Sequence, residues 1–349
     1  MTNKDYKRGR ASIGSASGGK LLKIKEEESR LDMEIDEAIA GAKMESVSDS
    51  ESDSVRGGGV LREAPKSTKK EKKINSWVGI RDRNFRTGDC LKLHFYGSGG
   101  QGIEMVYCEP GSFMMGSPED EEGRYEDEKL HPVTLTKGFW LSRYPVTYWQ
   151  WCFVMGEKAR RVGSAFRNTA VRGVSWQDCH KFCDRLNMKH YCGARLPTEA
   201  EWEYACRAGV AGRYGGTGSL DEMGRFGSEY PQHMRGYPDF YSSRAEFEAS
   251  NDEWVNPRVV GTKRPNKWGF FDMHGLVSEI CNDWYVDYPD CGVVDPEGSE
   301  SGDFKVVRGG CIHSKDNDCR CAFRGKVPWL LSGDELVFWD VGFRLCCGA

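Results

Sequence analysis

Arg195-Leu-Pro-Thr-Glu-Ala-Glu-Trp-Glu-Tyr-Ala205 is the stretch of this sequence that decides the fold. Thr198 and Glu201 stand three positions apart within it and form a capping box, in which each side chain binds the backbone N–H of the other residue. The pattern predicts a helix that runs on to Cys206 and ends at Gly209, because glycine readily takes the left-handed conformation that stops a helix. We expect Cys206 to lie in the core.

A second helix is predicted over residues 176–189, with Ser175 as its N-cap and Asp178 at the third position. Its apolar residues recur at the i, i+3, i+4, i+7 spacing of a buried helix face, namely Cys179, Phe182, Cys183 and Leu186. This spacing favours a core role over metal binding for the two cysteines.

Elsewhere the sequence is typical of short strands joined by turns and by long loops rich in glycine and tyrosine. The expected strands are residues 111–116, 133–136, 304–308 and 342–346, and the longest loop is 209–250. Ten of the eleven tryptophans lie beyond residue 100, and each buried indole removes on the order of 200 Å² from water. The sequence therefore predicts one large, irregular α+β domain.

The first 75 residues differ in composition from the rest. Their acidic run (46–54) and lysine-rich run (66–73) cannot bury enough apolar area to offset the entropy of ordering. Gly14-Ser-Ala-Ser-Gly-Gly-Lys20 has the outline of a phosphate loop, but Leu21 replaces the hydroxyl residue and no apolar strand precedes it. We expect a disordered charged tail over 1–75 and a folded domain over 76–349.

Charge, hydropathy and cysteine content bear on whether the chain binds nucleic acid, enters a membrane or forms disulfides. The chain of 349 residues has a net charge of -4 and so lacks the broad positive field that nucleic acids attract. No window reaches the roughly 18 apolar residues of a membrane span, and the start lacks the apolar core of a signal peptide. The 14 cysteines are only about 4% of the chain, below the ~8–10% typical of disulfide scaffolds. We expect a cytoplasmic protein with reduced, mostly buried thiols that binds neither nucleic acid nor membrane.

Six motifs follow one another along residues 101–349. They are Pro110-Gly-Ser-Phe-Met-Met-Gly-Ser117, Arg195-Leu-Pro-Thr-Glu-Ala-Glu-Trp-Glu-Tyr-Ala205, Pro265-Asn-Lys-Trp-Gly-Phe-Phe-Asp-Met-His-Gly275, Val307-Arg-Gly-Gly310, Arg320-Cys-Ala-Phe-Arg324 and Gly342-Phe-Arg-Leu345. In this order they resemble the formylglycine-generating-enzyme, or sulfatase-modifying-factor, family. The resemblance implies a C-type-lectin-like fold, in which the segment between the Arg-Gly-Gly and Gly-Phe-Arg motifs forms much of an open, loop-rich site.

The resemblance implies an oxidase only where two cysteines five positions apart follow Arg-Gly-Gly. Such a pair binds copper(I) as thiolates, which suit a soft metal. Here Ser314 stands five positions before Cys319, and Asp316 stands five before Cys321, so either register leaves one thiol. Copper and oxidase activity are therefore not favoured. A loop that brings Cys311 and Cys319 together stays open, and these two are the candidates for catalytic thiols.

Two further pairs of cysteines carry expectations about burial. Alternation along residues 319–324 predicts a strand with Cys319, Cys321 and Phe323 on its buried face. Cys346 and Cys347 are adjacent in a terminal strand, so they should point to opposite faces, one buried and the other exposed.

The resemblance also implies a calcium site at a Gly-Asn-x-Trp-Glu-Trp motif. This chain reads Gly275-Leu-Val-Ser-Glu-Ile280, which keeps Glu279 but places Leu276 where a side-chain oxygen is needed. Calcium at Glu279 stays open, and no metal is assigned. The sulfoxide-synthase branch of the family needs a His-x-x-x-His-x-Glu iron site, and none of the seven histidines are four apart. The carboxylates of 119–122 and 126–128 indicate a solvated acidic loop.

The departures from the family pattern cluster between Arg308 and Gly342, while the framework motifs are kept. This favours a module without oxidase activity that binds a protein or small molecule through its 308–342 surface, an arrangement that also resembles variable proteins of diversity-generating retroelements. The predicted contact residues are Ile312, His313, Ser314, Lys315, Asp316, Asn317, Trp329 and Trp339, since aromatic side chains are the usual anchors. The alternatives are a divergent copper oxidase acting on a cysteine of a client sulfatase, and a structural domain whose charged tail carries the interaction.

Overall fold

A computed structural model describes residues 72–74, 84–95, 98, 100–156, 167–227, 259–329 and 340–348. All of them belong to one compact unit, residues 67–349. The predicted tail lies outside the described residues except for β1 (Lys72–Ile74), which pairs in parallel with β2 (Cys90–His94). A strand therefore forms just before residue 76, where we expected the domain to start.

The largest sheet has six strands in the order β1-β2-β3-β6-β13-β7. Its central strands β3 (Gly102–Cys108), β6 (Phe139–Ser142) and β13 (Cys346–Gly348) pair antiparallel, and β7 (Ala194–Arg195) lies at the edge. The last strand of the chain thus lies inside the sheet.

Both faces of β13 are covered by packed side chains. Cys346 belongs to one core cluster and Cys347 to the other, and both are 0% exposed. The expectation that one of these two thiols is exposed is therefore wrong, because the terminal strand is not at a surface.

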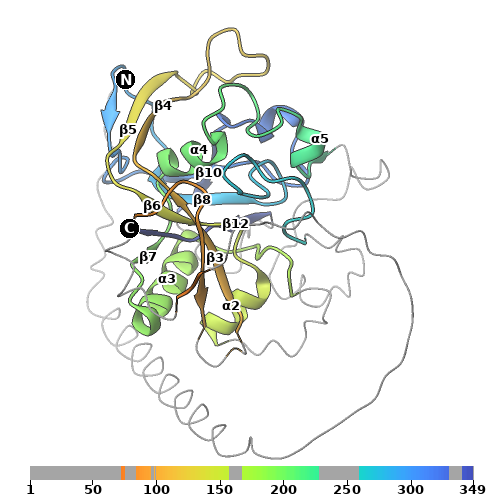
Figure 1. The fold of residues 1–349 in the computed structure, drawn as a ribbon. Helices are drawn as coiled ribbons and strands as arrows, with labels where there is room; N and C mark the ends of the chain where they lie inside the picture. Colours follow the sequence, from red (N-terminus) through yellow and green to blue (C-terminus); the bar gives the residue numbers. More distant parts are fainter. Residues whose placement is uncertain are drawn as a thin grey trace, which may run out of the picture. The chain divides into compact units, whose positions relative to one another are not determined.

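Helices cover the large sheet on two sides (Figure 1). α2 (Tyr148–Met155) and α3 (Trp176–His190) contribute to the first cluster, and α4 (Glu199–Arg207) contributes to the second. Both predicted helices and both capping boxes, at Ser175 and Thr198, are confirmed. A left-handed Ala208 ends α4 one residue before Gly209, and α5 (Leu220–Met223) follows after a short loop.

Two smaller sheets complete the α+β architecture. β11 (Gly325–Pro328), β10 (Phe304–Arg308), β8 (Ser278–Trp284) and β12 (Val341–Phe343) form one, and β4 (Gly111–Met115), β5 (His131–Leu135) and β9 (Val293–Val294) form the other. β10 has the predicted bounds. The strand predicted over 342–346 is instead divided between β12 and β13, so the chain passes from one sheet to another at Arg344 and Leu345.

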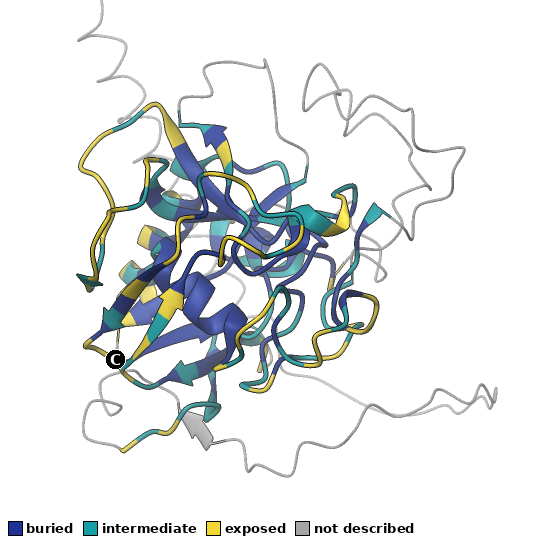
Figure 2. Cartoon of the chain, turned by 90° about the horizontal axis from the view of Figure 1, so that it is seen from above, coloured by how far each residue is buried: buried dark blue, intermediate teal, exposed yellow. Residues whose placement is uncertain are grey.

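Burial follows these layers, with buried residues along the strands and α4 and exposed ones mainly on the connecting loops (Figure 2). The strand predicted at 319–324 is absent: Asp316–Cys319 is a 3₁₀ helix and a turn follows it. Cys319 and Cys321 are nonetheless 0% exposed, so their predicted burial is confirmed. Within the described ranges, no helix has the length and apolar character needed to cross a membrane.

Candidate functional site

The candidate site is the loop 311–319, which leaves β10 through two glycines. Gly309 and Gly310 have φ values of +86° and +68°, a region that favours glycine. A Cβ on Gly310 would stand 2.5 Å from the Asp318 carbonyl oxygen and 3.0 Å from Cys319 Sγ. The loop therefore folds back onto its own start, and no larger residue fits there.

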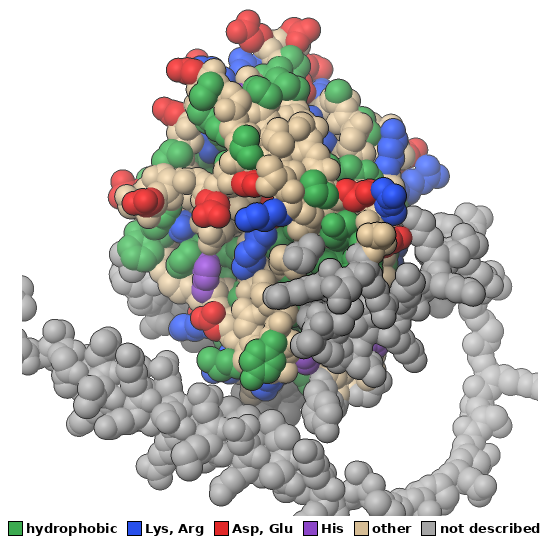
Figure 3. Space-filling view, turned by 60° about the vertical axis from the view of Figure 1, so that its left-hand side comes forward, with side chains coloured by type: hydrophobic (Ala, Val, Ile, Leu, Met, Phe, Trp, Pro, Cys, Tyr) green, Lys and Arg blue, Asp and Glu red, His purple; other side chains and the backbone are tan. Residues whose placement is uncertain are grey.

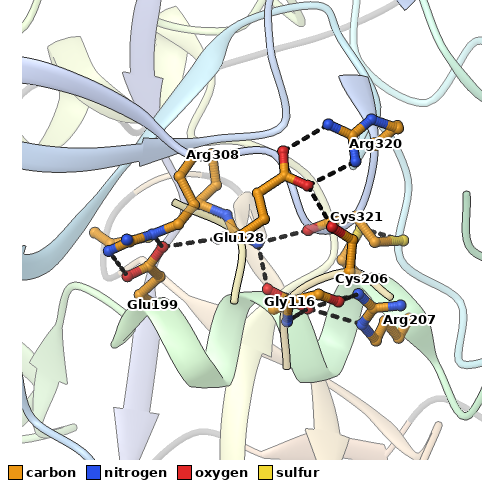
Figure 4. A network of polar contacts seen from close by, with 12 residues as sticks. Gly116, Glu128, Glu199, Cys206, Arg207, Arg308, Arg320 and Cys321 are labelled. Atoms are coloured by element: carbon orange, nitrogen blue, oxygen red, sulfur yellow. Dashed lines mark hydrogen bonds and ion pairs between the residues drawn. The ribbon is translucent and has the colours of Figure 1, made fainter. Parts of the chain in front are cut away.

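Buried arginines fix both ends of this loop in the domain (Figure 4). Arg308 donates to Glu199 at 2.7 Å and to Glu203 at 2.6 Å, and the Arg308 side chain is 0% exposed. Glu203 also accepts from Arg207 at 2.8 Å, and Arg324 donates to both oxygens of Glu199 at 2.7 and 3.0 Å. Arg308 and Arg324 flank the loop in sequence, so two carboxylates of α4 hold its flanking segments together.

A third buried arginine ties the loop to the acidic segment. Arg320 donates to Glu128 Oε2 and Glu121 Oε1, each at 2.7 Å. Glu128 is 0% exposed, and the Glu121 side chain is 6% exposed. The expectation of a fully solvated acidic loop is therefore wrong at these two positions, because Arg320 neutralises them inside the protein.

The calcium candidate, Glu279, has the same kind of partner. Its two oxygens accept from Arg344 Nε and Nη2, both at 2.8 Å, and from Trp202 Nε1 at 2.7 Å. Glu279 is 1% exposed. In this structure, therefore, a guanidinium and an indole N–H take both oxygens of Glu279.

The two candidate thiols differ in environment. Cys319 is 0% exposed, and burial raises the pKa of its thiol well above the usual value. Cys311 is half-buried, and its sulfur lies 3.5 Å from the Ser314 hydroxyl, which also accepts the Cys311 N–H at 2.9 Å. Ser314 thus fills the position where the pattern implied by the resemblance needs a second thiol.

The predicted contact residues of the loop do not all reach the surface. Lys315 and Asp316 are exposed. Asn317 accepts from Arg213 at 2.7 Å, and His313 lies 3.1 Å from Asp340.

Ile312 is 2% exposed, and its N–H donates to the Leu276 carbonyl at 3.3 Å. Ile312 therefore packs inside the domain, and the prediction that it contacts a ligand is wrong because its side chain is buried.

Trp329 lies in a different aromatic cluster. Its ring packs at 5.5 Å, edge to face, on Trp284. The Lys305 ammonium lies over the rings of Trp284 and Trp176, at 3.7 and 4.3 Å, and burial lowers its pKa to about 8. This buried lysine was missed because a single lysine in a strand gives no sequence signal. Trp339 lies outside the described residues.

One group in the described part of the chain has the composition and spacing of a metal site. Cys206 Sγ lies 3.5 Å from Cys321 Sγ and 3.9 Å from His274 Nε2. Burial lowers the pKa of His274 to about 4, so its imidazole is neutral. The sequence did not indicate this group, because its three members come from separate motifs.

Comparison with known proteins gives consistent matches. Residues 98–347 match the family model described as the sulfatase-modifying factor enzyme 1-like domain. The chain is 31% identical over 249 residues to serine/threonine-protein kinase pkn1 of Chlamydia pneumoniae, covering 63% of this chain and 35% of that protein. It is 34% identical over 155 residues to the formylglycine-generating enzyme of Streptomyces coelicolor, covering 44% and 45%. The chain thus spans about a third to a half of the length of these relatives.

Two solved structures resemble the domain over nearly their whole length. Treponema denticola variable protein 1 matches with a TM-score of 0.57 and 23% identity, over 73% of this chain and 98% of that one. PvdO from Pseudomonas aeruginosa matches with a TM-score of 0.57 and 25% identity, over 76% and 100%. The first likeness concerns the fold alone.

Proposed function

The chain belongs to the sulfatase-modifying factor enzyme 1-like family, and from that premise we propose that it is a binding module without oxidase activity. The family match and the solved structures confirm the expected α+β, C-type-lectin-like fold. The proposed ligand is a protein or a small molecule, bound on the 308–342 surface.

The state of the candidate thiols carries the proposal. An oxidase of the kind described above needs two thiolates that meet a soft metal and a substrate. In the loop 311–319, Ser314 stands in place of one thiol, and Cys319 is 0% exposed with a raised pKa. Cys311 alone does not supply the pair, which is why we do not favour the divergent oxidase.

The surroundings of the loop support a binding role. Tyr125, which is 45% exposed, donates to Asp318 at 2.7 Å, and Tyr214 donates to the Asp316 carbonyl at 3.1 Å. Arg213 joins Asn317 to the acidic segment through Glu122, at 3.1 Å. Aromatic rings and a guanidinium held beside exposed polar groups are the side chains that most often anchor ligands.

The proposed surface carries both signs of charge. Lys315 and Asp316 are adjacent and exposed. Over the one face of the molecule that Figure 3 shows, acidic and basic side chains are likewise interspersed. A mixed surface of this kind favours specific pairing with a partner over attraction to a uniformly charged polymer. With a net charge of -4, nucleic acid is not among the proposed partners.

A charge reversal on the loop tests the proposed surface. The whole chain is immobilised as the wild type, as Lys315→Glu and as Lys189→Glu, and proteins and metabolites retained from the native lysate are identified by mass spectrometry. Lys189 is an exposed lysine at the end of α3, so it matches Lys315 in charge and exposure. We expect ligands that wild type and Lys189→Glu retain and Lys315→Glu loses at least about tenfold. Equal retention by all three would contradict this surface.

Two finer points belong to the same proposal. If the binding surface is diversified by a retroelement, the genome should carry a near-identical template repeat beside a reverse transcriptase gene. Absence of that repeat would contradict diversification.

We also propose a cytoplasmic location, because none of the fourteen cysteines, all in described segments, takes part in a disulfide.

A further inference from the structure

Cys206, His274 and Cys321 form a cluster at the C-terminal end of α4, next to the end of the loop 311–319. Cys206 is in the last turn of α4, and Cys321 follows the 3₁₀ helix Asp316–Cys319. The three side chains are each 0% exposed, and their ligand atoms all lie within 4.8 Å of one another. Figure 4 shows the two cysteines side by side next to the arginine network.

The distances within the cluster match those around one small ion. Two sulfurs bound to one ion at about 2.3 Å stand about 3.8–4.0 Å apart, and a sulfur and a nitrogen stand about 3.6–3.8 Å apart. The observed separations are 3.5 Å between the sulfurs and 3.9 Å between Cys206 Sγ and His274 Nε2. For these two pairs, shifts of a few tenths of an ångström would reach the ion-bound separations, and the third pair, Cys321 Sγ and His274 Nε2, lies within 4.8 Å.

His274 is held in the tautomer that a ligand needs. Its Nδ1 lies 2.8 Å from the Cys319 carbonyl oxygen and donates to it, which leaves Nε2 as the acceptor facing the sulfurs. A backbone carbonyl that orients the far ring nitrogen in this way is the usual support of a metal-binding histidine. In this structure the Gly215 N–H donates a hydrogen bond to His274 Nε2 at 3.2 Å. Binding of an ion at Nε2 would require this hydrogen bond to break.

We propose that Cys206, His274 and Cys321 form a three-coordinate site for Cu(I), separate from the 311–319 loop. The donor set of two thiolates and one imidazole is soft, which selects Cu(I) or zinc over calcium or magnesium. Zinc takes a fourth ligand, and in the described segments the group holds no fourth His, Cys, Asp or Glu. Full burial of all three side chains also leaves no solvent-facing position for a bound water.

Two arginines lie near the thiols, although burial raises the pKa of Cys206 well above its usual value, so an incoming ion would have to displace the Cys206 proton. Arg308 donates to the Cys321 carbonyl at 2.5 Å, and Arg207 follows Cys206 directly in the chain. Cations beside a thiol favour its deprotonated form, which is the form that binds metal. The site therefore has the soft donors and the histidine tautomer that copper(I) requires, with two cations nearby.

Anaerobic titration of the whole reduced chain with Cu(I), against a chromogenic Cu(I) chelator, tests the assignment. We expect one equivalent to bind, and Cys206→Ser, Cys321→Ser and His274→Gln each to weaken binding more than about a hundredfold, beyond what changes outside the metal shell cause. Cys281→Ser, which alters another thiol that is 0% exposed, should bind like the wild type, as should Cys311→Ser.

Three results would overturn the assignment. They are no stoichiometric uptake of Cu(I), loss of uptake in Cys311→Ser or Cys319→Ser with retention in Cys206→Ser, and uptake of Zn(II) but not Cu(I) through the same three residues. If the site variants do not fold, X-ray absorption at the copper edge of Cys311→Ser decides instead. Two sulfurs and one nitrogen support the site, and any other shell contradicts it.

Discussion

At the residue scale, buried arginines paired with buried carboxylates are a recurring feature of this domain, and Arg344 is one of them. It is 0% exposed and donates to both oxygens of Glu279, to the Ser142 carbonyl at 2.9 Å and to the Phe271 carbonyl at 2.8 Å. A buried ion pair adds little net stability over an apolar pair, but removing one partner leaves an uncompensated charge. Replacing a buried arginine of this kind should therefore lower the free energy of unfolding strongly.

Arg344→Met should lower the free energy of unfolding by about 3–5 kcal/mol, because Glu279 would be left charged and buried. Arg264→Met is the matched control, since Arg264 pairs with Glu222 at 3.2 Å with side chains 69% and 45% exposed. The control should change stability by no more than about 1 kcal/mol. Urea unfolding of both variants measures the difference, and equal effects would contradict a structural role for the buried pair.

Asp283 gives a prediction about pH. It is 5% exposed and accepts the Glu199 N–H at 2.8 Å, and burial, reinforced by the Glu199 charge, raises its pKa to about 7. A carboxyl with a higher pKa in the folded state binds more protons there than in the unfolded state. Between about pH 4 and pH 7 its contribution to stability is therefore lost as the pH rises.

Asp283→Asn cannot ionise and can still accept the Glu199 N–H through its amide oxygen. We expect the variant to gain stability relative to the wild type from pH 5 to pH 7, with a slope approaching about 1.4 kcal/mol per pH unit. Chemical unfolding at several pH values measures this. A constant difference between the two proteins across that range would show that Asp283 is already ionised in the folded state.

At the residue scale, the sequence predicts the burial of some cysteines but not of the pair Cys346 and Cys347, and it does not show what any cysteine contacts. The helical spacing of Cys179 and Cys183 was enough to predict their burial. The pairing of Cys206 with Cys321 joins positions 115 residues apart, and no local pattern encodes such a contact. The same holds for Arg308 and its partner Glu203, which are 105 residues apart.

At the scale of elements, the capping boxes were the most informative local signals. Those at Ser175 and Thr198 begin α3 and α4 as predicted. An equivalent box of Thr147 and Gln150 begins α2, a helix that the aromatic-rich sequence after it did not suggest. The segment 319–324 was misassigned as a strand because its residues alternate between apolar and charged, but in the 3₁₀ helix and turn residues 319–322 are all buried, Arg320 among them.

The cap at Ser175 gives the prediction for this scale. Its side chain accepts the Asp178 N–H at 3.1 Å, and Ser175→Ala should cost about 1 kcal/mol of stability. Ser219 is the matched control, because it is the N-cap of α5 but forms no side-chain cap hydrogen bond. Ser219→Ala should leave the unfolding midpoint unchanged, whereas equal losses in both variants would remove the cap as the cause.

At the scale of the whole molecule, the order of the motifs was enough to predict the family fold, but the packing of the chain was not. The last strand, β13, lies inside the six-stranded sheet between β6 and β7, so sequence-distant segments meet there. Sheet order depends on such long-range pairings, which local propensities do not specify. Of the predicted contact surface, Lys315 and Asp316 are exposed, whereas Ile312 is buried.

The central claim is that this family scaffold binds rather than oxidises, and a peptide-oxidation assay tests it most directly. The whole chain, loaded with Cu(I) under oxygen, is incubated with a Cys-x-Pro-x-Arg peptide, and the peptide mass is followed over time. We predict no conversion of cysteine to formylglycine, even with copper bound at Cys206, His274 and Cys321. Multiple turnovers that Cys311→Ser or Cys319→Ser abolishes would contradict the account.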